Sequence, residues 1–299
     1  MKNMRDLYTD LQRDRSFHCY DVVRRKAEKI NNYFSQSKLD AAVLGVSGGV
    51  DSAVVLALLR YAQKQPNSPL QKIVSLLLPI DTRGATEQEL ALQRGRNVVS
   101  CLGGECWEAP LGGVQKAYLE AMPHMSSTPW SEGQLLSIVR TPALYFAAAQ
   151  LQAHGFSSLV VGTTNRDEGA YLGFFGKASD GMVDLQPISD LHKSEVYQIA
   201  RFLGVPQEVI EAPPSGNVFD GRIDEEMIGA PYWFVEMFLL AKERGIDLKT
   251  QICTEEQEQY RVWEQALEQQ HAKNAHKYRV GSPAIHFDVL PRAIPGGWS

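Results

Sequence analysis

The sequence predicts an α/β fold, a doubly wound parallel sheet flanked by helices. Apolar runs without polar alternation, at residues 41–44, 72–79 and 158–162, are typical of strands buried on both faces. Longer segments with helical periodicity separate these runs, and strands that alternate with helices indicate a parallel sheet. In such a sheet ligands bind beyond the carboxyl ends of the strands, so functional residues are expected in the turns that follow them.

Hydrophobic spacing and helix-breaking residues place the individual elements. Residues 1–38 are expected to be helical, because apolar residues recur at helical spacing and Asp21 can cap the segment. The helix after the first strand is expected to end at Pro66 and Pro69. The other elements expected are a helix through about residue 99, a short strand at 105–108, a long helix at 131–154 that contains Pro142, a helix at 191–203, a loop at 211–221, and helices at 224–243 and 254–273.

Length, charge and cysteine content narrow the function classes. The chain has 299 residues, which suits one domain spanning 1–299, with a helical C-terminal part at 224–275 and an irregular tail at 281–299. Its net charge of −5 provides no general basic surface for a nucleic acid. No apolar stretch approaches the ~20 residues of a membrane span, and the N-terminus lacks a signal-peptide core. The four scattered cysteines are typical of a reduced protein, so a cytoplasmic location is expected.

The turn after the first strand has the composition of an anion-binding site. It reads Ser47-Gly48-Gly49-Val50-Asp51-Ser52 and leads into a helix. The glycines let backbone N–H groups approach a phosphate, and the helix N-terminus adds partial positive charge. Asp51 cannot contact a bare phosphate favourably, so its presence implies a Mg²⁺ ion that binds both carboxylate and phosphate oxygens. The turn is not a Walker A loop, because no lysine follows the glycines.

The alternative interpretation of this turn is purely structural. Two glycines after a strand are common in tight strand-to-helix connections, and Ser47 could serve only to cap the helix. The apolar strand before the glycines and the Asp51-Ser52 pair after them favour the phosphate site.

A second polar turn follows the strand at 158–162. It reads Thr163-Thr164-Asn165-Arg166-Asp167-Glu168. Because both turns leave parallel strands at their carboxyl ends, we expect them to face one cleft.

Several segments of the chain resemble a known enzyme family. The first turn resembles the pyrophosphate loop of the ATP pyrophosphatases, which have an adenine nucleotide alpha-hydrolase-like fold. The later segments resemble the ammonia-dependent NAD synthetases, a branch of that superfamily. These segments are VVGTTNRDE at 160–168, GFFGKASDG at 173–181, DLQPI at 184–188, DLHKSEV at 190–196, APPS at 212–215, DEE at 224–226 and His276-Lys277 near the end.

The resemblance implies an amide-forming reaction in two steps. The nicotinate carboxylate of deamido-NAD attacks the α-phosphate of ATP and releases pyrophosphate, and ammonia then displaces AMP to give NAD. The implied cofactors are ATP and Mg²⁺, and the implied partners are deamido-NAD, ammonia and a second copy of the chain. No glutaminase-like segment is found, so the nitrogen donor is expected to be free ammonia or ammonia from a separate protein.

The resemblance also implies roles for individual residues. Lys193, Asp51 and Ser47 are expected to act in catalysis, and Asp51 with Glu168 to hold the metal. ATP is expected to contact Gly45, Ser47, Gly48, Gly49, Val50, Asp51, Ser52, Thr163, Lys193 and Ser215. The acceptor is expected to contact Arg140, Lys177, Asp180, Asp184, His276 and Lys277.

Each assignment has a plainer structural alternative. Glu168 alone could be a solvated surface carboxylate, and Lys193 a surface lysine at a helix start. Thr163 could be a helix cap, and Asp184 could serve in a turn or cap. A His-Lys pair near a terminus normally has no function.

The chain departs from the family pattern on the acceptor side. The long-helix segment has Gln134, Ile138 and Thr141 where the family has Asn, Arg and Met, and the family's Lys-Tyr-Gly-Asp reads Lys177-Ala178-Ser179-Asp180. Loss of a cation removes a charge-assisted hydrogen bond of about 1.5–3 kcal/mol where one is made. Three hypotheses follow: an NAD synthetase with a rebuilt acceptor pocket, a paralogue that amidates another carboxylate, or a nucleotide-binding regulatory protein without turnover.

Overall fold

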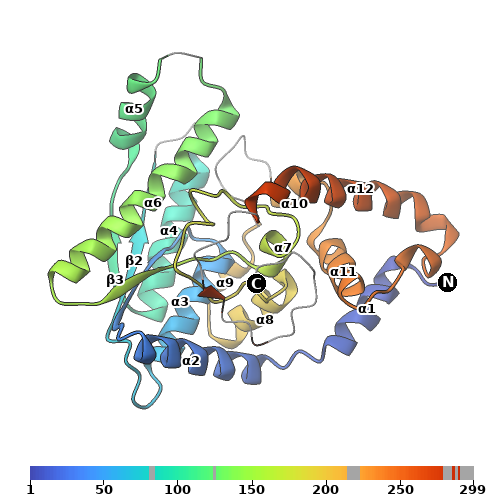
Figure 1. Ribbon diagram of the computed structural model, residues 1–299, viewed down its shortest axis with the longest axis horizontal. Coiled ribbons are helices and arrows are strands. Elements are labelled where there is room, and N and C mark those ends of the chain that lie inside the picture. Colours follow the sequence, from blue (N-terminus) through green and yellow to red (C-terminus); the bar gives the residue numbers. More distant parts are fainter. Residues whose placement is uncertain (81–84, 124–125, 214–222, 279–284, 287–288, 290–299) are drawn as a thin grey trace.

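The computed structural model describes residues 1–80, 85–123, 126–213, 223–278, 285–286 and 289. Six strands form one parallel sheet in the order β3-β2-β1-β4-β5-β6, which is the doubly wound arrangement predicted (Figure 1). The strands are β1 (Ala41–Gly45), β2 (Lys72–Leu77), β3 (Glu105–Glu108), β4 (Ser158–Val161), β5 (Leu185–Gln186) and β6 (Ile285–His286). The strand order reverses between β1 and β4, so the turns that follow these two strands lie side by side.

Both faces of the sheet are buried, as the apolar runs predict. Ala42 and Leu44 of β1 pack into the large core beneath α2 (Cys19–Gln36), α3 (Val50–Gln63) and α8 (Lys193–Phe202). Ala41 and Val43 point to the opposite face, where α6 (Pro129–Ala153) covers the sheet. Alternate residues of one strand therefore serve two cores, which explains why the strand sequence is apolar throughout.

A second group of helices packs beside the sheet and forms a core of its own. It comprises α1 (Met4–Arg15), α10 (Asp224–Ile228), α11 (Tyr232–Glu243) and α12 (Gln257–Asn274), on the right of Figure 1. Helix α11 also contacts α8 and α7 (Arg166–Gly169). The remaining helices of the described residues are α4 (Ala85–Leu102), α5 (Gly112–Ala121), α9 (Gln207–Ile210) and the 3₁₀ turns Leu248–Thr250, Thr254–Glu256 and Ala275–Lys277.

Several expected elements differ from those observed. The segment 1–38 forms two helices instead of a continuous one, because Ser16 adopts a left-handed conformation at the end of α1. The helix expected at 224–243 is divided, since Gly229 has a φ of 83° and Pro231 caps the start of α11. Helix α6 continues through Pro142 as expected. The tail expected to be irregular lies mostly outside the described residues, apart from β6 and Val289.

No helix among the described residues combines the length and the apolar character needed to cross a membrane.

A buried ion pair joins the N-terminal part of the chain to the segment that precedes α8. Lys26 and Asp190 form an ion pair and are both completely buried. Lys26 Nζ also donates to the carbonyl of Pro187, 2.7 Å away. Asp190 in turn accepts the backbone N–H of Val289 at 2.7 Å. The pair therefore connects α2, the start of α8 and the C-terminal segment.

Replacement of one member of this pair is expected to destabilise the fold strongly. Lys26→Met leaves Asp190 without its ammonium partner in a buried site, so the free energy of unfolding is expected to fall by about 3–5 kcal/mol in denaturant titration. Lys72→Met removes a partly exposed partner of Glu105 and is the matched control, with an expected loss of at most about 1 kcal/mol. Equal losses in the two variants would contradict the role assigned to the buried pair.

Candidate active site

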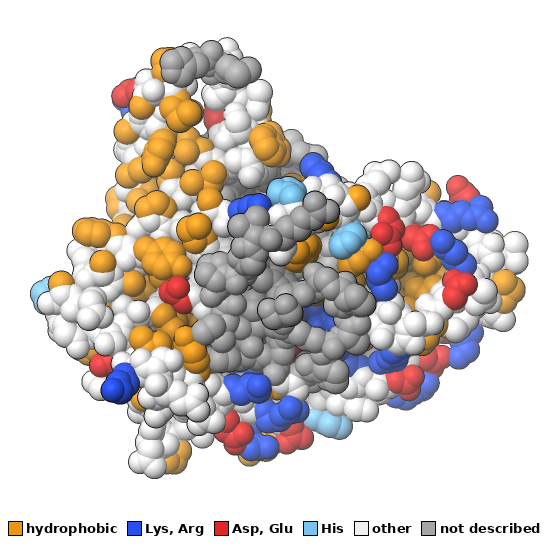
Figure 2. All heavy atoms as spheres, viewed as in Figure 1, with side chains coloured by type: hydrophobic (Ala, Val, Ile, Leu, Met, Phe, Trp, Pro, Cys, Tyr) orange, Lys and Arg blue, Asp and Glu red, His pale blue; other side chains and the backbone are white. Residues whose placement is uncertain are grey.

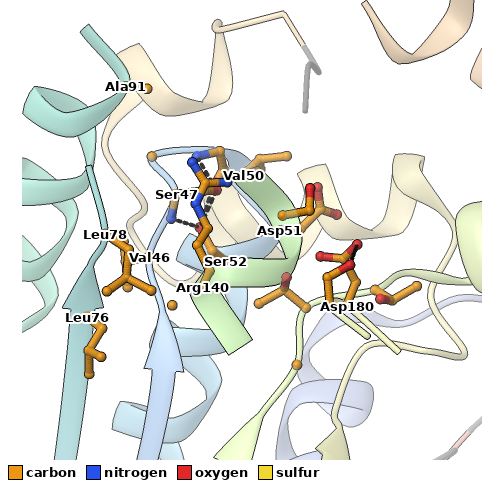
Figure 3. A pocket seen from close by; sticks show the side chains of 18 of the residues that line it. Val46, Ser47, Val50, Asp51, Ser52, Leu76, Leu78, Ala91, Arg140 and Asp180 are labelled. Atoms are coloured by element: carbon orange, nitrogen blue, oxygen red, sulfur yellow. Dashed lines mark hydrogen bonds between the residues drawn. The ribbon is translucent and has the colours of Figure 1, made fainter. Parts of the chain in front are cut away.

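A cavity of about 330 Å³ opens beyond the carboxyl ends of β1, β2 and β4 (Figure 3). The turns after β1 and β4 line it, together with side chains from α4 and α6. In Figure 3, Leu76 and Leu78 of the β2 end form an apolar side, and Asp51 and Asp180 lie on the opposite side. The cavity thus occupies the reversal point of the sheet, where α/β folds bind their ligands.

The turn after β1 is shaped by a glycine with a positive φ and by two serines. Gly48 has a φ of 82°, and a Cβ atom there would lie 2.1 Å from the carbonyl oxygen of Ala91 on α4. Ser52 Oγ accepts the N–H of Ser47 at 3.2 Å and donates to the carbonyl of Gly49 at 3.0 Å. These contacts hold the turn in a compact loop that packs directly against α4.

Helix α3 begins at this loop with its N-terminus at the cavity. The N-cap residue is Gly49, and no side chain caps the helix there. Ser47 Oγ accepts the N–H of Gly49 at 3.3 Å instead of bonding to a later turn of the helix, so Ser47 is not the cap that the structural alternative assumed. The first N–H groups of a 14-residue helix are thus available to an anion in the cavity.

Lys193 lies between two carboxylates contributed by the two turns. Its Nζ donates to Asp51 Oδ2 at 2.6 Å and lies 3.4 Å from Glu168 Oε1. Burial opposes the charge of Lys193, but the two carboxylates outweigh it and raise its pKa above the ordinary value. Burial also raises the pKa of Glu168 above its usual range, although Lys193 acts in the opposite direction. The structure therefore brings together the three charged residues that the sequence assigned to metal and phosphate chemistry.

Two further residues hold this group together and were not singled out from the sequence. Asn165 Nδ2 donates to Asp51 Oδ1 at 3.0 Å and to Glu168 Oε1 at 2.7 Å. The Tyr232 hydroxyl lies 3.1 Å from Glu168 Oε1 and 3.2 Å from Asp224 Oδ2. Asn165 belongs to the second polar turn, which the sequence predicted to face the cleft. Tyr232 opens α11, 64 residues after Glu168, and only the fold brings it to the site.

Arg94 of α4 is a third cavity residue that the sequence did not indicate. Its Nε donates to the carbonyl of Gly48 at 3.2 Å, and its side chain lines the cavity beside the first turn. The described cavity wall has two other cations, Arg140 and Lys193. A phosphate bound at the start of α3 would thus be flanked by Arg94 as well as by Lys193.

The residues expected to bind the acceptor fall into two groups. Arg140 and Asp180 line the cavity, as does Thr163, which was expected to contact ATP. Burial lowers the pKa of the Arg140 guanidinium, and Asp180 opposes that effect, so the two side chains interact electrostatically. Lys177 is exposed and is not among the described cavity residues.

Asp184, His276 and Lys277 also lie outside the described cavity wall. Asp184 accepts the backbone N–H of Val160 in β4 at 2.8 Å, a structural contact other than the turn or cap considered for it. His276 Nδ1 lies 3.1 Å from the carbonyl of Lys273, and the residue is exposed. Lys277 Nζ donates to the carbonyl of Gly173 at 2.7 Å and so supports the loop before Asp180. Ser215 lies outside the described residues.

The positions that depart from the family pattern are divided between the cavity and the surface. Thr141 lines the cavity, and its Oγ1 donates to the carbonyl of Ala178 at 2.8 Å, so two altered segments contact each other. Ile138 is 41% exposed on the outer side of α6, and Gln134 is not among the described cavity residues either. The change at Ile138 therefore alters the surface of this chain, whereas the altered residues Thr141 and Ser179 line the same cavity as Arg140.

Gly48→Ala is expected to disrupt the first turn. The left-handed conformation alone costs about 1–2 kcal/mol for a residue with a Cβ, and the contact with Ala91 forces the loop or α4 to move. The free energy of unfolding is thus expected to fall by at least that amount, with weaker binding of ATP analogues. Gly113→Ala in α5 is the control, because a Cβ there meets nothing within 4 Å and stability is expected to be unchanged or slightly higher. Unaltered stability of Gly48→Ala would contradict this description of the loop.

Comparisons with known proteins match most of the chain to one family. The model of the NAD synthase family matches residues 22–281. The NH₃-dependent NAD(+) synthetase of Archaeoglobus fulgidus is 34% identical over 224 residues, which cover 75% of this chain and 84% of that protein.

Solved structures share the fold. The NMN synthetase of Francisella tularensis aligns with a TM-score of 0.72 and 24% identity over 88% of this chain and 96% of its own. An NH₃-dependent NAD synthetase of Campylobacter jejuni aligns with a TM-score of 0.64 and 23% identity over the same shares of the two chains.

Proposed function

This chain belongs to the NAD synthase family, whose members form NAD by ATP-dependent amidation, and we propose which of its side chains serve each step of that reaction. The observation that carries the assignment is the placement of Lys193 between Asp51 and Glu168 at the start of α3. A regulatory protein without turnover would have no need to keep a buried lysine and two partly buried carboxylates converging on a helix terminus suited to phosphate.

ATP is assigned to the loop after β1, with its phosphates at the N-terminus of α3. The backbone N–H groups there, Ser47 and Lys193 would donate to the phosphate oxygens, and Arg94 would add a second cation. These groups stabilise the negative charge that accumulates on the departing pyrophosphate. Little acid–base catalysis is needed, because pyrophosphate and AMP are good leaving groups.

Asp51 and Glu168 are the residues that would hold Mg²⁺. Their carboxylates approach the same ammonium group from two different turns, so oxygen donors that a hard cation prefers already converge. The ion would neutralise phosphate charge that a carboxylate in this position otherwise repels.

The acceptor carboxylate is assigned to the side of the cavity that contains Arg140. The guanidinium would orient the nicotinate carboxylate toward the α-phosphorus, where a carboxylate oxygen forms the new P–O bond as the bond to pyrophosphate breaks. Ammonia then attacks the acyl carbon, the C–O bond electrons leave with AMP, and the added nitrogen loses a proton. Asp180 lines the same cavity.

A second acceptor, nicotinate mononucleotide, is favoured by one observation from the structure and one from the comparisons. The altered residues Thr141 and Ser179 line the same cavity as Arg140, and the solved structure reported above with a TM-score of 0.72 is described as an NMN synthetase. Both acceptors carry the same nicotinate carboxylate and differ in the adenylate half, so the chemistry of the reacting atoms is unchanged.

The test is turnover of the purified protein with ATP, Mg²⁺, ammonium and either acceptor, with NAD, NMN and pyrophosphate measured separately. NAD and pyrophosphate are expected in equal amounts with deamido-NAD. Preferential formation of NMN would transfer the assignment to the mononucleotide. If neither acceptor led to consumption of ATP, both acceptor assignments would be overturned.

Asp51→Asn is expected to lower kcat strongly with little effect on stability. The substitution keeps the side-chain volume but removes the charge that pairs with Lys193 and that would bind Mg²⁺. A loss of roughly 100-fold or more is expected, as for the removal of other preorganised electrostatic groups. Asp21→Asn, on the exposed side of α2, is the control and should retain full activity. Pyrophosphate release at the normal rate by Asp51→Asn would refute the metal assignment.

A homodimer is proposed from the surface of α5 and α6. Large apolar side chains are exposed there, including Met122, Trp130, Ile138 and Phe146, and apolar atoms gather over these helices on the left of Figure 2. A group of large exposed apolar side chains is typical of protein interfaces.

The four unpaired cysteines support the cytoplasmic location expected from the sequence.

Phe146→Glu is expected to convert the proposed dimer into a monomer, because it replaces a 65% exposed apolar side chain of this surface by a charge. Sedimentation equilibrium of the full chain measures the result. Val262→Glu on α12 introduces the same charge at a position with 52% exposure away from α6, and should leave the mass unchanged. A monomeric mass of the unsubstituted protein would contradict the proposal.

A further inference from the structure

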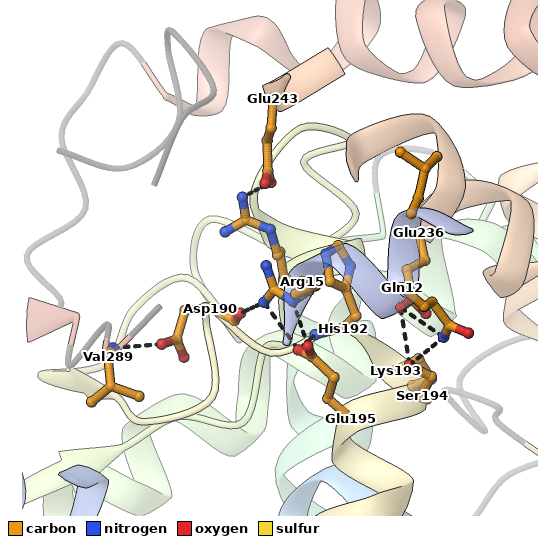
Figure 4. Close-up of polar contacts among 12 residues, drawn as sticks. Gln12, Arg15, Asp190, His192, Lys193, Ser194, Glu195, Glu236, Glu243 and Val289 are labelled. Atoms are coloured by element: carbon orange, nitrogen blue, oxygen red, sulfur yellow. Dashed lines mark hydrogen bonds and ion pairs between the residues drawn. The ribbon is translucent and has the colours of Figure 1, made fainter. Parts of the chain in front are cut away.

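A buried polar cluster lies behind Lys193, outside the cavity. It consists of Asp167 from α7, His192 before α8 and Glu236 from α11, all at most 2% exposed. Figure 4 shows His192, Lys193 and Glu236 beside side chains of α1. Burial of three ionisable groups is costly unless they are well paired, and none of the three is among the described cavity residues. The proposed reaction does not use them directly.

Asp167 fixes the first residue of α8. Its Oδ2 accepts the backbone N–H of Lys193 at 2.7 Å, and its Oδ1 lies 2.6 Å from Nδ1 of His192. A helix start has N–H groups without partners inside the helix, and Asp167 supplies one such partner. The same carboxylate thus holds the backbone of the residue whose Nζ contacts Asp51 at 2.6 Å.

Glu236 connects the cluster to α1. Its Oε1 accepts from Gln12 Nε2 at 3.1 Å and from Ser194 Oγ at 3.0 Å, and its Oε2 accepts from the Tyr8 hydroxyl at 2.9 Å. Ser194 follows Lys193 directly, so Glu236 also holds the first turn of α8. Helix α1 lies before residue 22, where the match to the family begins, so this support comes from a part of the chain outside that match.

His192 fills the space between the two carboxylates. Its Nε2 is buried and has no hydrogen-bond partner among the described residues, so Asp167 alone orients the ring by a hydrogen bond. The backbone N–H of His192 donates to Glu195 Oε2 at 2.9 Å, and Arg15 of α1 pairs with that same carboxylate. Contacts from α1, α7 and α11 thus converge on His192, Lys193 and Ser194 at the start of α8.

We propose that Asp167, His192 and Glu236 are positioning residues that hold the start of α8, and that α1 supports Lys193 through them. The proposal rests on the role assigned to Lys193 above. A displacement of about 1 Å in a catalytic group can cost roughly 100-fold in rate, so support behind Lys193 has a direct effect on turnover. The residues themselves do not touch the reacting atoms.

The test compares Asp167→Ala with Asp167→Asn. Asparagine keeps an oxygen that can accept the Lys193 N–H, whereas alanine leaves that N–H without a partner. Asp167→Ala is expected to lower kcat by roughly 10- to 100-fold with the KM for the carboxylate within about twofold, and Asp167→Asn to restore most of the loss. Asp247→Ala is the control, since Asp247 accepts the backbone N–H of Lys249 at 3.1 Å in an exposed turn.

Amide hydrogen exchange gives a readout that does not depend on activity. The Lys193 amide should lose protection in Asp167→Ala and recover it in Asp167→Asn, even if the unsubstituted protein turns over neither acceptor. That result separates a failure of the proposed function from a failure of the positioning role. Unchanged kcat and unchanged exchange in Asp167→Ala would overturn the proposal, as would equal losses in the alanine and asparagine variants.

The contribution of α1 is tested by Gln12→Leu, which removes a donor to Glu236. A several-fold fall in kcat is expected, whereas Thr9→Ala on the same helix should have no effect, because Thr9 Oγ1 donates to the carbonyl of Arg5 within α1.

A metal site is the alternative role for Asp167, His192 and Glu236, because their oxygen and nitrogen atoms that could bind a metal lie within 4.8 Å of one another. One zinc ion per chain, lost in His192→Gln, would overturn the positioning role.

Discussion

The ion pair between Lys193 and Asp51 is the contact on which the rest of the site depends. Asp51 stands in the first turn of the helix that follows β1, and Lys193 begins a helix that follows β5. The pair therefore joins two segments that are 142 residues apart in the chain. Glu168 and Asn165 complete the group from the turn after β4. Loss of Lys193 would leave Asp51 and Glu168, both largely buried, without its ammonium group, which is strongly unfavourable.

The parallel sheet explains why these segments meet. Strands β1 and β4 are neighbours with the same direction, so the turns that leave their carboxyl ends are adjacent. The apolar sequence of β1 serves the cores on both faces of the sheet, and the polar residues begin where the strand ends. The cavity is thus a consequence of the strand order, and the charged residues around it are placed by short connections from rigid elements.

The sequence was sufficient to predict the fold class and the charged centre of the site. The fold class and the turns that hold Asp51 and Glu168 follow from local signals, namely apolar strands and polar turns directly after them, whereas the role of Lys193 came from the resemblance to the NAD synthetases. Strands β5 and β6 were not predicted, because two residues carry no periodicity. The helix break at Gly229 and Pro231 was missed although both residues are typical of helix ends. Tyr232 and Arg94 reach the site only through packing between distant helices, which no local pattern indicates.

The acceptor side shows where a family pattern and a structure give different information. The altered residues Thr141 and Ser179 line the same cavity as Arg140, and Thr141 Oγ1 donates to the backbone carbonyl of Ala178. Ile138, also altered, faces outward among the exposed apolar residues of α6. A comparison by sequence position treats these changes alike, whereas the structure assigns one to the cavity and the other to the surface.

The central claim is that Lys193, Asp51 and Glu168 act together as a site for ATP with its Mg²⁺ ion. Calorimetric titration of the full chain with a non-hydrolysable ATP analogue, with and without Mg²⁺, tests this directly. Binding is expected to be at least about tenfold tighter with Mg²⁺, and this difference is expected to disappear in Asp51→Asn. Equal affinity of the unsubstituted protein in the presence and absence of Mg²⁺ would contradict it.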